Sequence, residues 1–236
     1  MTVKRHPQEH RKFVALLLLA GVIFLQNLYG LAVSDATASS AGESHAVFRY
    51  TTGAAGSPDN MRCVASTIAD LWMVTAAHCL IIDVAQLSIL CRDVNGQWRV
   101  AMASIDKLVQ HMTHDVALVK LTAPLCNCQG VINLDATLPD TDTFIVPVLA
   151  NSASKDLSLR YARVKEVARD AHTIRVWDSG VCLQQGDSGM PIFERNMLSG
   201  WGLAAVLIAG APDCQGVQTA VRLDNLMPWI GQITQE

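Results

Sequence analysis

Short hydrophobic runs separated by turn-forming residues cover the chain from residue 46 onward. Many of these runs alternate apolar and polar positions or are rich in β-branched residues, which is typical of half-buried β-strands. The runs that predict strands are Ala46–Tyr50, Val64–Ile68, Trp72–Thr75, Leu87–Cys91, Trp98–Ala103, Val116–Leu121, Phe144–Leu149, Ala162–Val167, Thr173–Trp177, Pro191–Phe193, Leu203–Ile208 and Gln218–Val221. Many short strands with frequent turns predict an all-β fold, either a barrel or a sandwich.

Two local signals refine this pattern. Asp93-Val94-Asn95-Gly96 stands between two predicted strands and predicts a hairpin turn. Near the end of the chain the apolar residues take up helical spacing, at Leu223, Leu226, Met227 and Ile230. We expect a short C-terminal helix there, with Asp224 as its N-cap and Pro228 in its first turn.

The first 36 residues predict an export segment. The basic pair Arg11-Lys12 precedes an apolar run from Phe13 to Leu25, and small residues follow from Ala32, which is the order of a secretory signal. A cleaved signal peptide is the preferred interpretation, and an uncleaved anchor reaching to Val33 is the alternative. We therefore expect a secreted or periplasmic protein, which would be bound to the membrane only if this segment is not cleaved. Residues 37–45 form a flexible lead-in, and residues 46–236 form the main domain.

Composition excludes several classes of protein. Half of the residues are hydrophobic and only 17% are charged, which argues against disorder. The net charge of −3 and the lack of a basic run with aromatics argue against a nucleic-acid partner. The seven cysteines fit an oxidising compartment. None has zinc spacing, since Cys126-Asn127-Cys128 is too tight, so we expect no metal.

Three motifs in the order His, Asp, Ser carry the candidate chemistry. They are Val74-Thr75-Ala76-Ala77-His78-Cys79, His114-Asp115-Val116-Ala117-Leu118 and Gly186-Asp187-Ser188-Gly189-Met190-Pro191. Amide hydrolysis at neutral pH needs an activated hydroxyl, a base beside it and a carboxylate that orients the base. Each motif alone also fits a turn or a core position. Their combination predicts a catalytic site made of His78, Asp115 and Ser188.

These stretches resemble the chymotrypsin (trypsin-like) family of serine proteases, and among its members the compact bacterial ones such as the glutamyl endopeptidases. Cys63 and Cys79 are spaced like the family's disulfide that closes the loop beside the catalytic His. The end of the chain is also similar to the family's last strand and terminal helix, in Gly216-Val217-Gln218-Thr219-Ala220-Val221 and Pro228-Trp229-Ile230.

The resemblance implies two six-stranded antiparallel β-barrels with the active site between them. It places His78 and Asp115 on the first barrel and Ser188 on the second. Ser188 would be the nucleophile, His78 the general base and acid, and Asp115 its orienting partner. The backbone N–H groups of Gly186 and Ser188 would form the oxyanion hole, Gly186 in a turn that needs unusual backbone angles. The resemblance implies a polypeptide substrate, a protein inhibitor as a further partner, and no cofactor.

The chain departs from the family at several positions. Met190 replaces the second glycine after the serine, and no basic residue followed by Ile-Val-Gly-Gly is present. The pocket acid of enzymes that cut after Lys or Arg is replaced by Cys182. If Cys182 pairs with Cys214, as a similar family bridge implies, the pocket base moves to about Gly180, and Gly216 is a further residue of the expected specificity pocket. We therefore expect small or apolar residues before the cleaved bond.

Two alternatives remain beside a protease. A lipase or esterase of the α/β-hydrolase type needs G-x-S-x-G, and Met190 stands where the last glycine is required. A catalytically silent binding protein on the protease fold normally lacks a residue of the triad, whereas this chain has all three. A serine endopeptidase is the preferred interpretation.

Overall fold

The computed structural model describes residues 47–52, 61–80, 86–92, 98–125, 134, 143–151, 157–177, 181, 183, 186–196, 200–210 and 216–235. All of them belong to the second of two compact units, Ser40–Glu236. The predicted export segment (1–36) and lead-in (37–45) lie outside the described residues. Within the described part of the chain, no helix has the length and apolar character needed to cross a membrane.

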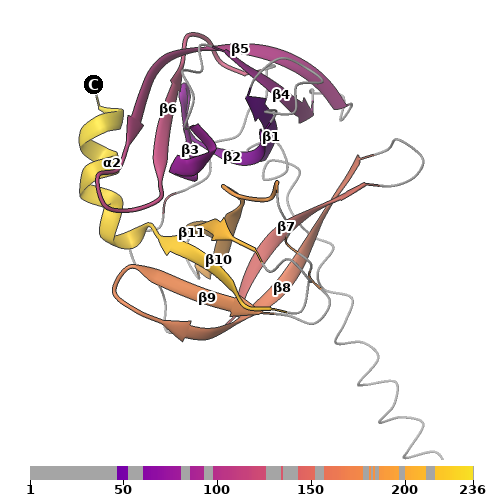
Figure 1. Cartoon of the computed structure of the whole chain (residues 1–236), viewed down its shortest axis with the longest axis vertical. Coiled ribbons are helices and arrows are strands. Elements are labelled where there is room, and N and C mark those ends of the chain that lie inside the picture. Colours follow the sequence, from indigo (N-terminus) through magenta and orange to yellow (C-terminus); the bar gives the residue numbers. More distant parts are fainter. Residues whose placement is uncertain are drawn as a thin grey trace, which may run out of the picture. The chain divides into compact units, whose positions relative to one another are not determined.

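The first six described strands close into an antiparallel barrel in the order β1-β2-β3-β6-β5-β4 (Figure 1). The pairing of β1 with β4, in which Arg49 lies opposite Leu90, closes the barrel. The strand bounds are Val47–Thr52 (β1), Met61–Ala69 (β2), Trp72–Thr75 (β3), Gln86–Arg92 (β4), Trp98–Gln110 (β5) and Ala117–Leu121 (β6).

The next six described strands form a second antiparallel barrel in the order β10-β11-β12-β9-β8-β7. This barrel is closed by one register pair between β10 and β7, Phe193 opposite Ile145. The strand bounds are Thr143–Asn151 (β7), Leu157–Arg169 (β8), Thr173–Trp177 (β9), Pro191–Asn196 (β10), Gly200–Ala209 (β11) and Gln218–Arg222 (β12). The predicted all-β fold of two six-stranded barrels is confirmed.

The strands β2, β3 and β6 bury both of their faces. On β3, Met73 belongs to the core inside the first barrel, whereas Trp72 and Val74 belong to a second core cluster that also contains Phe144 and Ile192 of the second barrel. Successive side chains of a strand point to opposite faces, so one strand serves both clusters. This shared burial joins the two barrels, and it explains why β3 reads as a continuous hydrophobic run.

Strand β5 is longer than its hydrophobic pattern predicts. The alternation ends at Ala103, but the strand continues to Gln110. Its first half pairs with β4 and its second half with β6, and the register with β6 shifts between Ile105 and Lys107. A bulge bends a strand and increases its twist. The polar residues at which the apolar–polar alternation of β5 ends therefore lie where the strand changes its pairing partner from β4 to β6.

The predicted C-terminal helix is present as α2 (Met227–Thr234), with Pro228 in its first turn. Ile230 is buried in the core cluster that contains residues of both barrels. The predicted N-cap is wrong, because Asp224 lies inside the 3₁₀ turn η4 (Asp224–Leu226) and α2 begins without a side-chain cap. The carboxylate of Asp224 is instead held by the Arg222 guanidinium, a charge-assisted partner.

Candidate active site

His78 lies in the short 3₁₀ helix η3 (Ala77–Leu80) directly after the buried strand β3. Cys79 is disulfide-bonded to Cys63 of β2, as the family resemblance implied. The hydroxyl of Thr75, at the end of β3, donates to the carbonyl oxygen of Val64 at 2.8 Å. The disulfide and this hydrogen bond attach both ends of the segment around His78 to the same strand, β2.

Asp115 comes from the loop between β5 and β6 and meets His78 through two hydrogen bonds. Its Oδ2 lies 2.6 Å from His78 Nδ1, and its Oδ1 accepts the backbone N–H of His78 at 2.8 Å. Both side chains are about one third exposed, at 34% and 32%. With the proton of the neutral ring on Nδ1, the lone pair of Nε2 is left for another partner.

The pairing changes the acidity of both groups. The hydrogen bond to Asp115 raises the pKa of His78 above its ordinary value, although partial burial opposes this shift. Partial burial acts to raise the pKa of Asp115, but the hydrogen bonds from His78 outweigh it and the pKa of the carboxyl lies below its ordinary value. An ionised Asp115 beside a basic His78 is the arrangement that a general base requires.

Ser188 lies in a tight turn before β10, where Gly186 has φ 100° and Gly189 has φ 87°. These left-handed backbone angles favour glycine, so the turn expected at Gly186 is present. The Ser188 carbonyl accepts the N–H of Val64 at 2.8 Å, and the Gly189 N–H donates to the Leu207 carbonyl at 2.7 Å. The serine turn is thus held between β2 of the first barrel and β11 of the second.

A short path of contacts brings the serine turn to the histidine segment. The Cys79 sulfur lies 3.9 Å from the Ser188 carbonyl oxygen, and Cys79 directly follows His78. Because this sulfur is disulfide-bonded and has no hydrogen to donate, the contact is van der Waals packing. The structure therefore brings together His78, Asp115 and the backbone of Ser188, three positions far apart in sequence.

The departure at Met190 is accommodated by the core. Its side chain is fully buried among residues of both barrels. Its N–H donates to the Asp187 carbonyl at 3.0 Å, and its carbonyl accepts the Leu207 N–H at 2.9 Å. The bulkier residue therefore packs inward and leaves the hydrogen bonds of the serine turn in place.

Most of the expected specificity pocket lies outside the described residues. Gly180, Cys182 and Cys214, with the predicted Cys182–Cys214 bridge, lie outside the described residues, as do Cys126 and Cys128. Gly216 is described and lies half-buried, two residues before β12.

Sequence reasoning missed Gln218, the first residue of β12. Its side chain is fully buried, its Nε2 donates to the Val181 carbonyl at 3.4 Å, and its Oε1 has no hydrogen-bond partner among the described residues. One feature of the sequence could have revealed it: Gln218 stands two residues before the apolar Ala220 in a predicted strand, so both side chains point to the same, inward face.

Among the described residues, one group of candidate metal ligands converges within 4.8 Å, namely Cys63, His78 and Cys79. Both cysteines are joined in the disulfide, and metal ligation requires free thiolates. This group therefore cannot hold a metal ion while the disulfide is intact.

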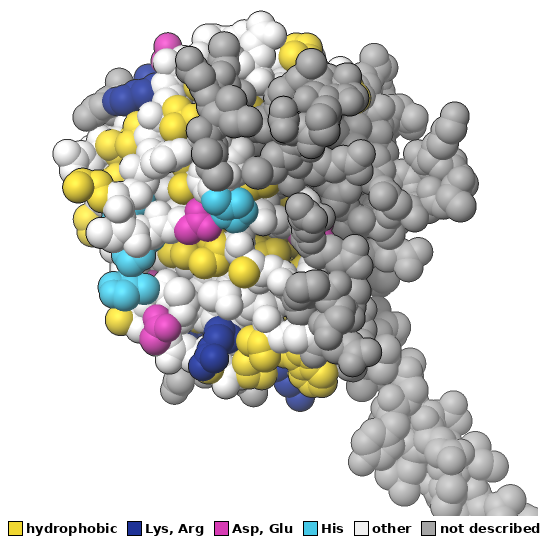
Figure 2. Space-filling view, in the orientation of Figure 1, with side chains coloured by type: hydrophobic (Ala, Val, Ile, Leu, Met, Phe, Trp, Pro, Cys, Tyr) yellow, Lys and Arg dark blue, Asp and Glu magenta, His cyan; other side chains and the backbone are white. Residues whose placement is uncertain are grey.

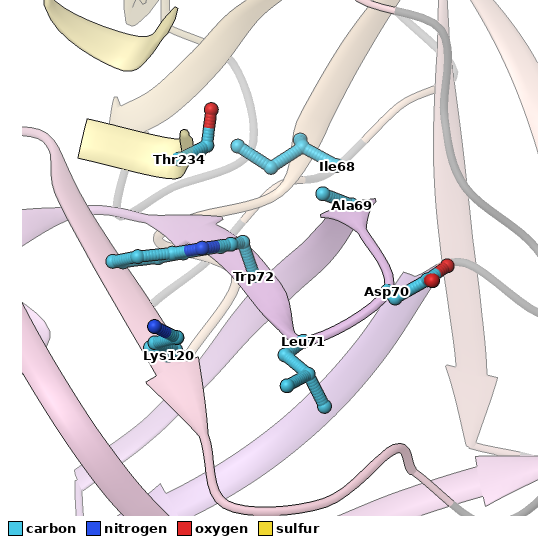
Figure 3. Close-up of a pocket in the computed structure, with 7 residues that line it drawn as sticks. All are labelled: Ile68, Ala69, Asp70, Leu71, Trp72, Lys120 and Thr234. Atoms are coloured by element: carbon cyan, nitrogen blue, oxygen red, sulfur yellow. The ribbon is translucent and has the colours of Figure 1, made fainter. Parts of the chain in front are cut away.

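A shallow pocket of about 480 Å³ lies on another part of the surface (Figure 3). It is formed by the β2–β3 turn with Asp70, by Lys120 of β6 and by Thr234 of α2. The Lys120 ammonium lies 5.5 Å from the centre of the Trp72 ring and also pairs with Asp106 at 3.9 Å. Because none of the three candidate catalytic residues lines this pocket, it is not part of the candidate active site.

Histidine side chains occupy two places on the face shown in Figure 2, one of them against an acidic side chain. In the described part of the chain, the contacts define two groups that contain histidine, namely the pair His78–Asp115 and the ring cluster of His111, His114 and His172.

Comparison with curated proteins finds no match to this chain. The chain does match a protein-family model, described as Trypsin, over residues 35–230. That span covers both barrels, α2 up to Ile230, and all three candidate catalytic residues. The chain belongs to the trypsin family.

Proposed function

We propose that the chain is an exported serine endopeptidase in which Ser188, His78 and Asp115 form a catalytic triad. The observation that carries the proposal is the 2.6 Å hydrogen bond between His78 Nδ1 and Asp115 Oδ2, next to the turn that holds Ser188. Membership of the trypsin family supports a polypeptide substrate.

In the proposed reaction, Ser188 Oγ attacks the carbonyl carbon of the peptide bond while His78 Nε2 takes the hydroxyl proton. His78 then gives that proton to the leaving amine, and an acyl-enzyme ester remains on Ser188. A water molecule hydrolyses this ester with His78 again acting as the base. Asp115 keeps the Nδ1 proton in place and stabilises the imidazolium that forms in each step.

The developing oxyanion needs donors that are already in position. We assign this role to the backbone N–H groups of Gly186 and Ser188. Support comes from the φ of 100° at Gly186, a backbone conformation that a residue with a side chain rarely adopts. The bonds from Val64 to the Ser188 carbonyl and from the Gly189 N–H to Leu207 hold the turn on both sides.

The proposal includes export and a preference for small or apolar residues before the cleaved bond. Export rests on the basic and apolar pattern of residues 1–36, and amino-terminal sequencing of the protein outside the cell would distinguish a cleaved signal peptide from a retained anchor. Cleavage of a peptide library tests the preference, which a strong selection of Arg or Lys would overturn.

The decisive experiment for the triad is labelling with a fluorophosphonate, which phosphonylates an activated serine. Wild type should label, and Ser188→Ala should lose the label while keeping the same unfolding midpoint. A folded wild-type protein that does not label would instead support the alternative, a catalytically silent binding protein on the protease fold.

A further inference from the structure

Asp115 is held by a loop with its own hydrogen bonds. The loop begins at His111, directly after β5, and ends at Val116, directly before β6. The His111 N–H donates to the Val116 carbonyl at 2.9 Å, and the Val116 N–H donates to the His114 carbonyl at 2.8 Å. The position of Asp115 therefore depends on how firmly this loop is closed.

The imidazole of His111 makes further bonds inside the loop. Its Nδ1 accepts the backbone N–H of His114 at 3.2 Å and that of Thr113 at 3.3 Å, and the Thr113 hydroxyl lies 3.5 Å away. A ring nitrogen can accept only when it carries no proton. The ring therefore acts here as an uncharged acceptor, with its proton on Nε2.

The β8–β9 turn is built in the same way with a carboxylate. Asp170 Oδ1 accepts the N–H groups of His172 and Thr173, each at 2.7 Å, and Oδ2 accepts the Thr173 hydroxyl at 2.7 Å. Both acceptors bind the N–H groups two and three residues further on, which is the pattern of an Asx turn. Asp170 keeps its acceptor over most of the pH range, since these bonds lower its pKa to about 2. An imidazole loses the acceptor as soon as it is protonated.

Packing keeps the His111 ring in place. The ring stacks on His114 at 4.7 Å between centroids and meets the edge of Trp229 of α2 at 4.9 Å. His114 in turn packs on His172 of the β8–β9 turn at 4.7 Å. Among the described residues, the titratable groups that these contacts place around His111 are His114 on its own loop and, beyond it, His172 with Asp170, while α2 contributes the uncharged ring of Trp229. Partial burial, and then the charges on His111 and His172, lower the pKa of His114, which favours the uncharged form of that ring.

We infer that His111 is a positioning residue, whose unprotonated Nδ1 closes the loop that presents Asp115 to His78. This inference rests on the proposed catalytic role of Asp115. The hydrogen bond from Asp115 is the main cause that raises the pKa of His78, so a looser loop weakens the base as well as misplacing it.

Two substitutions at His111 test its hydrogen-bond acceptor and its ring packing separately. His111→Asn places an amide oxygen where Nδ1 stands and removes the ring contact with Trp229. His111→Phe keeps a ring and removes the acceptor. His172→Phe is the matched control, since it makes the same change on a neighbouring histidine whose ring accepts no bond in the Asp115 loop.

The first readout is the rate constant of fluorophosphonate labelling as a function of pH. We expect His111→Phe to lower the rate about 10-fold to 100-fold, the effect of misplacing a catalytic group by a fraction of an ångström to an ångström. Its acid limb should also move to lower pH, because the pKa of His78 falls. His111→Asn should stay within about 3-fold of wild type, and His172→Phe should match wild type. A destabilised fold alone would lower the unfolding midpoint without moving the acid limb.

The second readout, hydrogen exchange at the amides of Thr113 and His114, does not require activity. Exchange should be at least about 10-fold faster in His111→Phe than in wild type and His111→Asn. Unchanged exchange, an unmoved acid limb, or an Asn variant as impaired as the Phe variant would each overturn the inference. A wild-type protein that does not label refutes the proposed function, and the exchange rates then decide whether Nδ1 closes the loop.

Discussion

Replacing Gly189 with alanine tests the contact that holds the serine turn against the first barrel. Gly189 directly follows Ser188 and has φ 87°. A Cβ added there would lie 1.9 Å from the Val64 carbonyl oxygen and 2.4 Å from Thr75 Oγ1. Val64 is β-strand backbone in the buried core, and the Thr75 hydroxyl already donates to that same carbonyl. Neither atom is the end of a flexible side chain, so the backbone has to move.

The cost of Gly189→Ala can be built from these contacts. The left-handed conformation costs an alanine about 1–2 kcal/mol. Moving the turn away from β2 breaks the bond from Val64 to Ser188 and disturbs the one from Thr75 to Val64, each worth about 1 kcal/mol, with a larger penalty where a buried group loses its partner. We therefore expect Gly189→Ala to lower the free energy of unfolding by about 4 kcal/mol or more.

Urea unfolding of wild type and variants measures this loss, and Gly231→Ala is the control. Within the part of the chain that the structure describes, a Cβ at Gly231 would meet no atom within 4 Å apart from its chain neighbours and the backbone of its own helix, and the residue lies inside α2. Alanine in a helix should therefore raise the free energy of unfolding by about 0.5–1 kcal/mol. The reasoning is refuted if Gly189→Ala unfolds within about 1 kcal/mol of wild type, or if the two glycines respond alike.

Three further predictions follow from the site and its surroundings. Asp115→Asn should slow fluorophosphonate labelling by about 10³–10⁴-fold and shift its acid limb to lower pH, since the carboxylate raises the pKa of His78; an unshifted limb contradicts this. Replacing Cys63 and Cys79 together by serine should lower the free energy of unfolding by about 3 kcal/mol in urea, because the bridge closes a loop of sequence separation 16; an unchanged midpoint contradicts it. Asp170→Ala should destabilise the protein above about pH 4, and the difference from wild type should shrink as pH falls towards about 2. The loss appears at the higher pH because the folded-state pKa of Asp170 is depressed, so the ionised carboxylate stabilises the fold above the unfolded-state pKa and stops doing so as pH falls through the folded-state pKa. A difference in stability that does not change with pH would contradict the role of Asp170 in the turn.

Much of the strand pattern could be predicted from local alternation. The strands Trp72–Thr75 and Thr173–Trp177 have the bounds that their hydrophobic runs predict. The prediction from alternation failed where a strand changes partner, as in β5 beyond Ala103. The polar residues there lie at a bulge, where the strand begins to pair with a second neighbouring strand. The capping rule failed at Asp224, which lies inside a 3₁₀ turn with its carboxylate held by Arg222.

The residues of the candidate site could likewise be predicted only in part from the sequence. His78, Asp115 and Ser188 stand in motifs that the chain itself displays, and the Cys63–Cys79 bridge follows from a family spacing. Gln218 stood in a motif only as a residue of the predicted last strand, and no motif marked His111. A buried polar side chain and an imidazole acceptor become visible only when their partners, Val181 and the amides of the Asp115 loop, are in place.

The sequence by itself thus determined the fold class, the order of the strands and the candidate residues of the proposed triad, because strand periodicity and short motifs are local properties of a chain. Only the tertiary structure decided which strands close each barrel and that both faces of β3 are buried. It also decided that Asp115 lies 2.6 Å from His78, with the serine turn packed on β2 beside them. These features depend on long-range packing between segments far apart in sequence, which no local pattern encodes.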